Sequence, residues 1–359
     1  MKFKALFAVL LTALFAGCSD EPTKDSSKAQ KYIEPQGIEV HAVCSLLCEK
    51  PNALSVSLLG DGAIALQGCF ERASLKVFTN DVVSSKSADI VVFSSAANNT
   101  PSFSDATLLA MMVDVRGIKM GELKEILESF PCPEETSHIW MLGEFKWLVV
   151  GSKQPVNVDV SSILEVFTRE ELFEDIALAR LNSAPMIFAN YAGTLKSALE
   201  AFLPEGLENE AFAEFFITRD IPEITWLETT NLDEDVAKAV LTEIRSAQVV
   251  RRLVIEGAMM GRSGKEAEAI NMWARAALRN PGDLYLAGRV GVLESNARAF
   301  LKLGNIKGAA KCFEMLILIN PADEANMFNY ATAMQRIGET NVAAHAFERV
   351  EKLRRAKEK

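Results

Sequence analysis

The segment at residues 304–321, GNIKGAAKCFEMLILINP, sets the pattern for the C-terminal third of the chain. Glycine opens the segment, and alanine, phenylalanine and proline follow it at offsets of 5, 9 and 17 residues. A similar order starts 34 residues later, at residue 338 (GETNVAAHAFERV), and 40 residues earlier, at residue 264 (GKEAEAINMWARAALRNP). We therefore predict three similar units, each a pair of antiparallel helices with a turn at its glycine.

The repeated positions have side chains suited to packing. Glycine tolerates the left-handed conformation that ends the first helix, alanine lets the two helices approach, and the aromatic residue fills the space between neighbouring pairs. The first spacing exceeds the second by six residues (40 against 34), and we expect the extra residues near residues 283–292, in a first helix or the turn before it. The nine packing positions are Gly264, Ala269, Trp273, Gly304, Ala309, Phe313, Gly338, Ala343 and Phe347.

This period and residue pattern resemble the tetratricopeptide repeat family over residues 250–357. The resemblance implies that the pairs stack into an all-α solenoid, because one pair alone cannot bury its apolar face. It also implies that a protein or peptide partner binds to the concave face of the array.

The N-terminus has the features of a secretion signal at residues 1–17. Two lysines precede an apolar run that is too short to span a bilayer stably. Residues 15–18 (FAGC) resemble a bacterial lipobox, which implies that Cys18 is lipidated and anchors the protein to a membrane; an ordinary cleaved signal peptide is the alternative. Aspartate stands at position 20 rather than directly after the cysteine, so we expect a cell-envelope protein at the outer membrane, facing the periplasm.

The remaining composition predicts a tether and two folded domains. Residues 18–36 are polar and are expected to stay unfolded. An α/β domain is expected at residues 37–227, a connecting helix at 228–249 and the helical repeats at 250–357. The formal net charge of −10 argues against nucleic acid as a partner and against adhesion to anionic lipid, so membrane contact is expected through the lipid anchor alone.

The cysteines and histidines do not form a pattern typical of a metal site. Five cysteines follow Cys18, and the three histidines stand apart from them, so we expect buried thiols and no metal. Cys44 and Cys48 lie four residues apart in a predicted helix, which places them on one face but in poor geometry for a mutual disulfide.

The start of the α/β domain has the order of elements of a Rossmann-like fold. A buried strand at residues 53–59 leads to Gly60, Asp61 and Gly62, and a helix at 63–70 precedes a second strand. That strand, at residues 75–79, ends in Asn80 and Asp81. In a nucleotide-binding fold this order places loop amides against the ligand and the second acid on its ribose.

Several runs in the same region resemble motifs of the spermidine synthase family, a class I methyltransferase-like fold. They are the glycine loop LLGDG at residues 58–62, the strand end FTND at 78–81, the strand ADIVV at 88–92, the helix at 120–130, the strand at 147–152 and the segment at 218–222. They occur in the order of the family and imply a domain that binds an S-adenosyl cofactor and a polyamine.

The departures from that family point to a reduced domain. Asp81 and Asp89 are eight residues apart, which leaves no room for the family's third strand and helix. Residues 94–97 (SSAA) stand where the family has its catalytic aspartate, and a serine without a base cannot accept a proton at neutral pH. The helix that follows is expected to shrink to residues 103–108. We therefore expect no catalytic residue and no cofactor.

Two hypotheses remain from the sequence. In the first, the chain is a non-catalytic interaction scaffold. In the second, a remnant loop still holds a polyamine or an S-adenosyl ligand, or acts as an aminopropyltransferase-type enzyme. The residues of this loop would be Gly60, Asp61, Gly62, Asp81 and Asp89. The structural alternatives are a turn residue for Asp61 and a strand cap for Asp89.

The second half of the α/β domain is predicted to be helical. Ser161 or Ser162 is expected to cap a helix that begins at residue 163. Thr168 and Glu171 have the spacing of a capping box for a helix to residue 181. Further helices are expected at residues 185–202 and 233–249.

Overall fold

The computed structural model describes residues 37–81, 87–95, 103–105, 107–142, 145–179, 181, 184–202, 204, 207–208 and 221–357. The predicted signal segment, Cys18, the tether and residues 218–220 lie outside the described residues. The chain divides into two compact units, an α/β domain that ends at Arg252 and a helical region that starts at Leu253. This boundary falls within one long helix, α10 (Glu234–Arg262).

The α/β domain contains a seven-stranded mixed sheet with the order β2-β1-β3-β4-β6-β5-β8. The first four strands in this order are parallel, whereas β6 is antiparallel to both of its neighbours and β8 is antiparallel to β5. The strands are β1 (Ser55–Leu59), β2 (Lys76–Thr79), β3 (Ile90–Ser94), β4 (Leu108–Asp114), β5 (Ser137–Met141), β6 (Lys146–Gly151) and β8 (Tyr191–Thr194). The central strands are continuous apolar runs, as expected for parallel strands that are covered on both faces.

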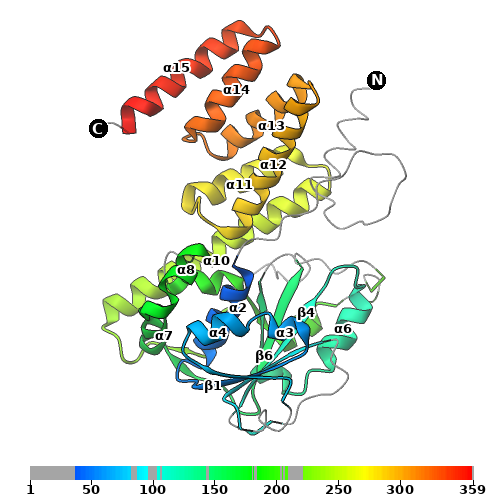
Figure 1. Ribbon diagram of the computed structural model, residues 1–359, viewed down its shortest axis with the longest axis vertical. Coiled ribbons are helices and arrows are strands. Elements are labelled where there is room, and N and C mark those ends of the chain that lie inside the picture. Colours follow the sequence, from blue (N-terminus) through cyan, green and yellow to red (C-terminus); the bar gives the residue numbers. More distant parts are fainter. Residues whose placement is uncertain are drawn as a thin grey trace. The chain divides into compact units, whose positions relative to one another are not determined.

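The helices of this domain are short apart from α2 and α10. Figure 1 shows α2, α3 and α4 together on one side of the sheet. Nearly every residue of α2 is buried, so this helix is part of the core. The helices are α2 (Ile38–Glu49), α3 (Asp61–Ile64), α4 (Gln67–Arg72), α6 (Met120–Glu128), α7 (Val160–Phe167), α8 (Phe173–Leu178) and α9 (Leu195–Glu200). Short 3-10 turns at Glu134–Thr136, Glu170–Leu172 and Ala184–Asn190 and a small parallel pair, β7 (Val158–Asp159) and β9 (Leu227–Glu228), complete the described elements.

Two predicted helices near the sheet differ from the structure. The helix expected at residues 63–70 is two short helices, α3 and α4, with a turn at Ala65 and Leu66 between them. Residues 103–105 and 107 are not helical, and Leu108 already belongs to β4. Thr107 Oγ1 donates a hydrogen bond to the carbonyl of Ala88, which holds this segment at the start of the strand.

The predicted caps and helices after residue 158 also need correction. The cap of α7 is Asp159, whose carboxylate accepts from Ser161 N at 2.7 Å, so neither Ser161 nor Ser162 has this role. Thr168 donates to the carbonyl of Glu165 and closes α7 instead of opening the next helix. The capping box was therefore a wrong prediction, because a 3-10 turn and the short α8 replace the continuous helix.

The segment at residues 185–202 contains a strand that the sequence pattern missed. A 3-10 turn, β8 and α9 occupy the span where one helix was predicted. β8 pairs with β5, itself not predicted, through His138 opposite Thr194. Pairing between segments more than fifty residues apart in sequence overrode the helical character of this alanine-rich stretch.

The helical region consists of three antiparallel helix pairs, as predicted. After the second half of α10 come α11 (Glu266–Arg279), α12 (Leu284–Lys302), α13 (Ile306–Ile319), α14 (Glu324–Arg336) and α15 (Thr340–Lys357). The turns within the pairs are at Gly264, Gly304 and Gly338, whose φ angles are 75°, 73° and 90°. The six extra residues lengthen a first helix, since α12 has 19 residues and α14 has 13.

The repeated small and aromatic residues pack between the helices. Ala269, Ala309, Ala343, Trp273 and Phe313 are buried, and Phe347 is half-buried against Phe328. A second small position lies seven residues before each turn glycine, and its residues are Gly257, Ala297 and Ala331. The two alanines are fully buried. This second signal is also periodic in the sequence but was not recognised there.

Candidate functional site

The order of the sheet reverses at β1, because β2 lies on one side of it and β3 on the other. In open α/β sheets, ligands bind at such a switch point, in the crevice beyond the carboxyl ends of the strands. Gly60 follows β1 at this edge, and Ser94 ends β3 beside it. The predicted glycine loop therefore lies where this fold class places a ligand.

The loop is held closed by groups of the protein itself. Gly60 N donates a hydrogen bond to Asn80 Oδ1 at 3.1 Å, and the Gly60 carbonyl accepts from Ala63 N and Ile64 N. A Cβ added to Gly60 would come within 3.4 Å of Ser94 Cβ, and one added to Gly62 within 3.6 Å of Ser94 Oγ. The serine side chain thus packs against both glycines. The first loop amide already has an acceptor within the protein, and Ser94 lies beside the two glycines.

The acidic residues predicted for this loop lie at opposite ends of the parallel strands, and these two ends are called the two edges of the sheet below. Asp61 is the first residue of α3 and is exposed, and Asp81 follows β2 at the same edge. Asp89 precedes β3 and therefore lies at the opposite edge. The five residues of β3 separate the two edges by about 16 Å at ~3.3 Å per residue. The structure therefore brings Asp61 and Asp81 to the glycine loop but not Asp89.

Asp89 holds the start of β1. Its Oδ2 accepts hydrogen bonds from Leu54 N at 2.9 Å, from Ser55 N at 3.0 Å and from Ser55 Oγ at 2.9 Å. Partial burial acts to raise the pKa of this carboxyl, but the bonds from Leu54 and Ser55 outweigh burial and lower the pKa below 3.8. The geometry is that of the strand cap considered as the structural alternative.

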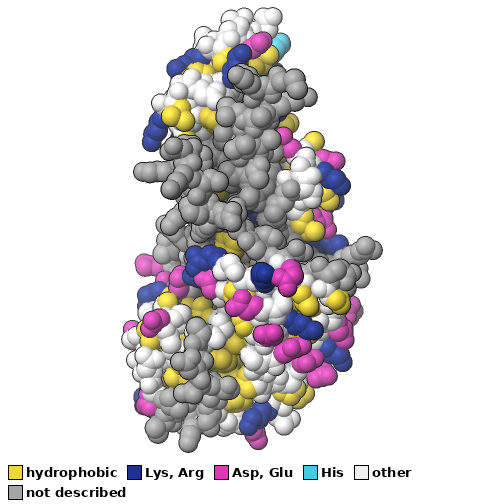
Figure 2. Space-filling view, turned by 90° about the vertical axis from the view of Figure 1, so that its right-hand side faces the viewer, with side chains coloured by type: hydrophobic (Ala, Val, Ile, Leu, Met, Phe, Trp, Pro, Cys, Tyr) yellow, Lys and Arg dark blue, Asp and Glu magenta, His cyan; other side chains and the backbone are white. Residues whose placement is uncertain are grey.

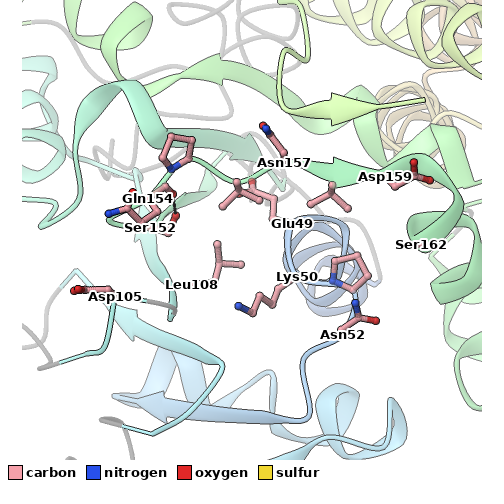
Figure 3. A pocket seen from close by; sticks show the side chains of 14 residues that line it. Glu49, Lys50, Asn52, Asp105, Leu108, Ser152, Gln154, Asn157, Asp159 and Ser162 are labelled. Atoms are coloured by element: carbon pink, nitrogen blue, oxygen red, sulfur yellow. Dashed lines mark hydrogen bonds between the residues drawn. The ribbon is translucent and has the colours of Figure 1, made fainter. Parts of the chain in front are cut away.

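A cavity of about 420 Å³ lies at this second edge of the sheet. Figure 3 shows Lys50 and Leu108 extending into the space between Asp105 on one side and Asn52 on the other. The lining is largely polar and includes Ser152, Gln154, Asn157 and Ser162. No sequence motif indicated this recess, because its residues come from three stretches of the chain, at residues 49–52, at 105 and 108, and within 152–162.

The carboxylates that line the cavity have partners within the protein. Asp105 forms an ion pair with Lys153 at 2.8 Å, and Asp159 caps α7. Glu49 Oε1 accepts from Trp140 Nε1 at 2.6 Å. These contacts assign the three acids to structure rather than to a pair that exchanges protons with a ligand.

Beneath the cavity, Glu49 is the centre of a buried polar cluster. Its side chain is 0 % exposed, and its second oxygen lies 3.1 Å from Nδ1 of His138, which is 5 % exposed. The His138 ring stacks on Trp226, with ring centres 5.4 Å apart. Burial, with the Glu49 charge nearby, raises the pKa of Tyr191 far above its usual value. Two features of the sequence could have indicated this cluster. Glu49 is an acidic residue at the end of an apolar helix, and His138 and Trp140 alternate along a strand.

A second buried chain of hydrogen bonds links four segments. Arg251 donates to Asn190 Oδ1 at 2.6 Å, and Asn190 Nδ2 lies 2.6 Å from His41 Nδ1. His41 Nε2 lies 3.0 Å from the carbonyl of Ala179. The amide of Asn190 donates to Nδ1, so the proton of His41 is on Nε2 and the imidazole is neutral. This arrangement holds α10 to the core and leaves no nitrogen of His41 for a metal or a substrate.

No protein-family model, curated protein or solved structure gave a significant match to this chain. Within the described residues, no helix combines the length and apolar character needed to cross a membrane. The same part of the chain contains no group of three or more His, Cys, Asp or Glu residues arranged to hold a metal ion.

Proposed function

We propose that this protein is a non-catalytic scaffold of the cell envelope, which is anchored by lipid at Cys18 and binds a protein partner through its paired helices. The proposal rests on the closed glycine loop. Asn80 Oδ1 accepts the hydrogen bond of the Gly60 amide, and Ser94 lies beside both glycines. A cofactor phosphate or ribose that binds this amide would have to displace Asn80.

The strand order supports descent of the α/β domain from a larger nucleotide-binding fold. A doubly wound sheet has the order 3-2-1-4-5-6, and removal of its third strand leaves 2-1-4-5-6. The parallel part of this sheet, β2-β1-β3-β4, corresponds to the first four strands of that remainder, 2-1-4-5. We infer a spermidine synthase-like domain in which the short connection after Asp81 replaced the missing strand, together with the contacts that such a strand makes to the cofactor.

The helix pairs support the assignment to tetratricopeptide repeats. Glycine with positive φ recurs at each turn, and small residues recur at two positions where helices approach. Asn326 Nδ2 lies 3.4 Å from Glu294 Oε1, so the first helices of the second and third pairs, α12 and α14, are neighbours along one face. We propose that this face of first helices binds the partner.

Surface charge gives no support to a nucleic-acid partner. Where Figure 2 colours the described residues, acidic and basic side chains are interspersed, and the chain as a whole is acidic. Binding of nucleic acid is typically carried by a basic patch or stripe. A protein segment is the partner that fits an array of helix pairs.

A ligand-binding remnant is the second candidate function. It is favoured by Asp61 and Asp81, which stand at the same edge as the glycine loop, where a polycation could bind. Calorimetric titration of the protein with S-adenosylmethionine, its decarboxylated form and spermidine distinguishes the two. The scaffold proposal expects no heat of binding. Binding that disappears in Asp61→Ala would establish the remnant site instead.

The partner face can be tested with matched pairs of variants. Partners cross-linked to the protein in intact cells are quantified for Arg298→Glu with Phe328→Ala on the first helices, and for Leu278→Ala with Leu318→Ala on the second helices. Leu278 and Leu318 are well exposed, whereas Phe328 is 43 % exposed and also packs on Phe347, so far-UV circular dichroism first checks that both pairs fold like the wild type. We expect loss of the partner only with the first pair; loss only with the second pair would contradict the proposed face.

The anchor can be tested by labelling cells with an alkyne-bearing fatty acid. We expect label in the wild-type protein and none in Cys18→Ser. Label that persists in the variant, or a wild-type protein without label, would exclude lipidation at Cys18.

A further inference from the structure

Three buried cysteines lie on neighbouring helices of the α/β domain, and neither the glycine loop nor the cavity uses them. Cys44 and Cys48 are one turn apart on α2, and Cys69 is on α4. Figure 1 shows α2 and α4 side by side, and their Cα atoms come within 8 Å of each other. All three thiols are free.

The helical period determines which way Cys44 faces. Gly37, His41 and Cys44 follow one another at intervals of four and three residues, so they share one side of α2. This side packs on the end of α8, because His41 Nε2 lies 3.0 Å from the Ala179 carbonyl and a Cβ on Gly37 would touch Ala179 at 2.9 Å. Cys44 is therefore one turn further along the surface that faces α8.

A single arginine connects α8 to the thiol of Cys69. Arg72 Nε donates to Asp175 Oδ2 of α8 at 2.7 Å, and Arg72 Nη2 donates to Cys69 Sγ at 3.2 Å. The Cys69 sulfur and the Asp175 carboxylate thus lie at one guanidinium. Asp175 stands four residues before Ala179, and Cys44 stands three residues after His41, so each lies about one turn from the His41–Ala179 contact. This places Cys44 on the part of α2 nearest to Asp175 and to the Cys69 thiol that shares its arginine, and Cys48 one turn further away. The charges of Cys69 and Asp175 also act to raise the pKa of Cys44, which agrees with this placement.

We propose that Cys44 and Cys69 form an intramolecular disulfide bond when the protein meets a small disulfide oxidant such as oxidised glutathione. Cys69 loses its proton and attacks one sulfur of the oxidant, and one glutathione leaves as a thiolate. Cys44, also deprotonated, then attacks Cys69 Sγ and displaces the second glutathione. Two protein thiols are oxidised, one oxidant disulfide is reduced to two thiols, and the two protons pass to solvent or to the departing thiolates.

The surroundings determine the order and the pace of these steps. Cys69 is 7 % exposed and has a guanidinium at its sulfur, while Cys44 is 0 % exposed. Burial raises the pKa of Cys44 to about 12, with smaller contributions from Cys69 and Asp175. Burial also raises the pKa of Cys69, but Arg72 opposes it. Cys69 therefore reacts first, and the reaction is slow near neutral pH and faster as pH rises.

The other cysteines are poorly placed to compete. Cys44 and Cys48 share one helix, where the geometry does not suit a disulfide. Cys132 follows α6, and Cys312 belongs to α13 of the helical region. The bond does not require the proposed scaffold function, since its chemistry needs only the folded α/β domain and the oxidant.

The test is oxidation of the full-length native protein with oxidised glutathione, followed by thiol counting and peptide mapping without reduction. The unfolded chain is oxidised in parallel in denaturant. The time that its thiols need to react sets how long the native protein is exposed to the oxidant. Cleavage after glutamate separates residues 40–49, which hold Cys44 and Cys48, from residues 50–71, which hold Cys69. We expect the loss of two thiols and a covalent link between these two peptides.

Cys48→Ala is the matched control, because Cys48 is as buried as Cys44 and lies on the same helix. It should retain the link, whereas Cys44→Ala and Cys69→Ser should abolish it, with far-UV circular dichroism confirming that each variant is folded. The peptide map of the wild-type protein tests the proposal even if a variant fails to fold. No thiol loss in the native protein, a link to any other peptide, or a link that survives in Cys44→Ala would overturn the proposal.

Discussion

Gly257 of α10 lies close against Trp273 and Ala269 of α11. A Cβ at this position would lie 2.5 Å from Trp273 Nε1 and 3.1 Å from the Ala269 carbonyl. The same indole nitrogen donates to the Val254 carbonyl at 3.0 Å, so the ring cannot move without the loss of a buried hydrogen bond. The tryptophan fits because position 257 has no side chain.

We predict that Gly257→Ala lowers the free energy of unfolding by about 1–3 kcal/mol, because the methyl group overpacks the interface. Urea denaturation followed by circular dichroism measures the change. Gly291→Ala is the control, since no atom lies within 4 Å of its added Cβ and the helix should gain about 0.5–1 kcal/mol. Equal effects of the two changes would contradict the close approach.

Asp89 contributes stability through the hydrogen bonds of its ionised form. Its folded pKa lies below 3.8, so this contribution is complete above about pH 3.8 and is lost as pH falls through the lower folded value. We predict that Asp89→Ala costs about 1–3 kcal/mol at neutral pH, because two backbone donors lose their acceptor. Below pH 3.8 the difference from wild type should shrink.

Urea midpoints measured from pH 7 to pH 3 check this prediction. Asp105→Ala is the matched control, because Asp105 is 75 % exposed and pairs only on the surface with Lys153. A penalty for Asp89→Ala that stays constant across the acid range would show that ionisation is not its source.

At the scale of elements, Glu49 joins the end of α2 to β5. Both carboxylate oxygens are used, one by Trp140 and one by His138, and the side chain is fully buried. Truncation of one member of a buried charged group leaves the partners unpaired. We predict that Glu49→Ala lowers the free energy of unfolding by about 3–5 kcal/mol and that Glu49→Gln costs less, because its amide oxygen can still accept.

Denaturant unfolding followed by tryptophan fluorescence suits this prediction, because Trp140 and Trp226 report on the cluster. Glu122→Ala on the exposed side of α6 should change stability by no more than about 0.5 kcal/mol. A Glu49→Ala protein as stable as the Glu122→Ala protein would mean that the buried cluster contributes little net stability.

At the scale of the whole molecule, the chain has two compact units, one built around the sheet and one from helix pairs. Each buries its own apolar residues, which is the condition for separate unfolding transitions. We predict two components in differential scanning calorimetry. Gly304→Val should lower the midpoint of one component, since a β-branched residue is strained at φ 73°, and Glu49→Ala should lower the other. One transition that both variants shift equally would show a single cooperative unit.

The helical region was predictable from the chain because its signals are local. Gly264, Gly304 and Gly338 recur at fixed offsets from buried alanines, and each helix pair forms its contacts with neighbours in sequence. The strands expected at residues 53–59, 75–79 and 88–92 were predictable for a similar reason, since each is a short run of apolar and β-branched residues close to glycine or polar residues. Both conclusions required only the period and the residue type.

Long-range pairing was not predictable in the same way. β8 follows an alanine-rich stretch with helical character and becomes a strand only because β5 presents an open edge to it. The sequence pattern places Asp89 at the start of a strand, and a strand cap was one of the two roles considered for it, but the pattern does not indicate which groups its carboxylate binds. Its role depends on Leu54 and Ser55, which stand more than thirty residues earlier.

The pattern of residues along the chain was thus sufficient for the class of fold, the helix pairs and the location of the glycine loop, because backbone propensity and hydrophobic period are properties of neighbouring residues. Closure of that loop by Asn80 and Ser94, the cavity above Glu49 and the meeting of Cys44 with Cys69 depend on distances between segments. Those distances follow from sheet order and helix packing, which no local pattern encodes.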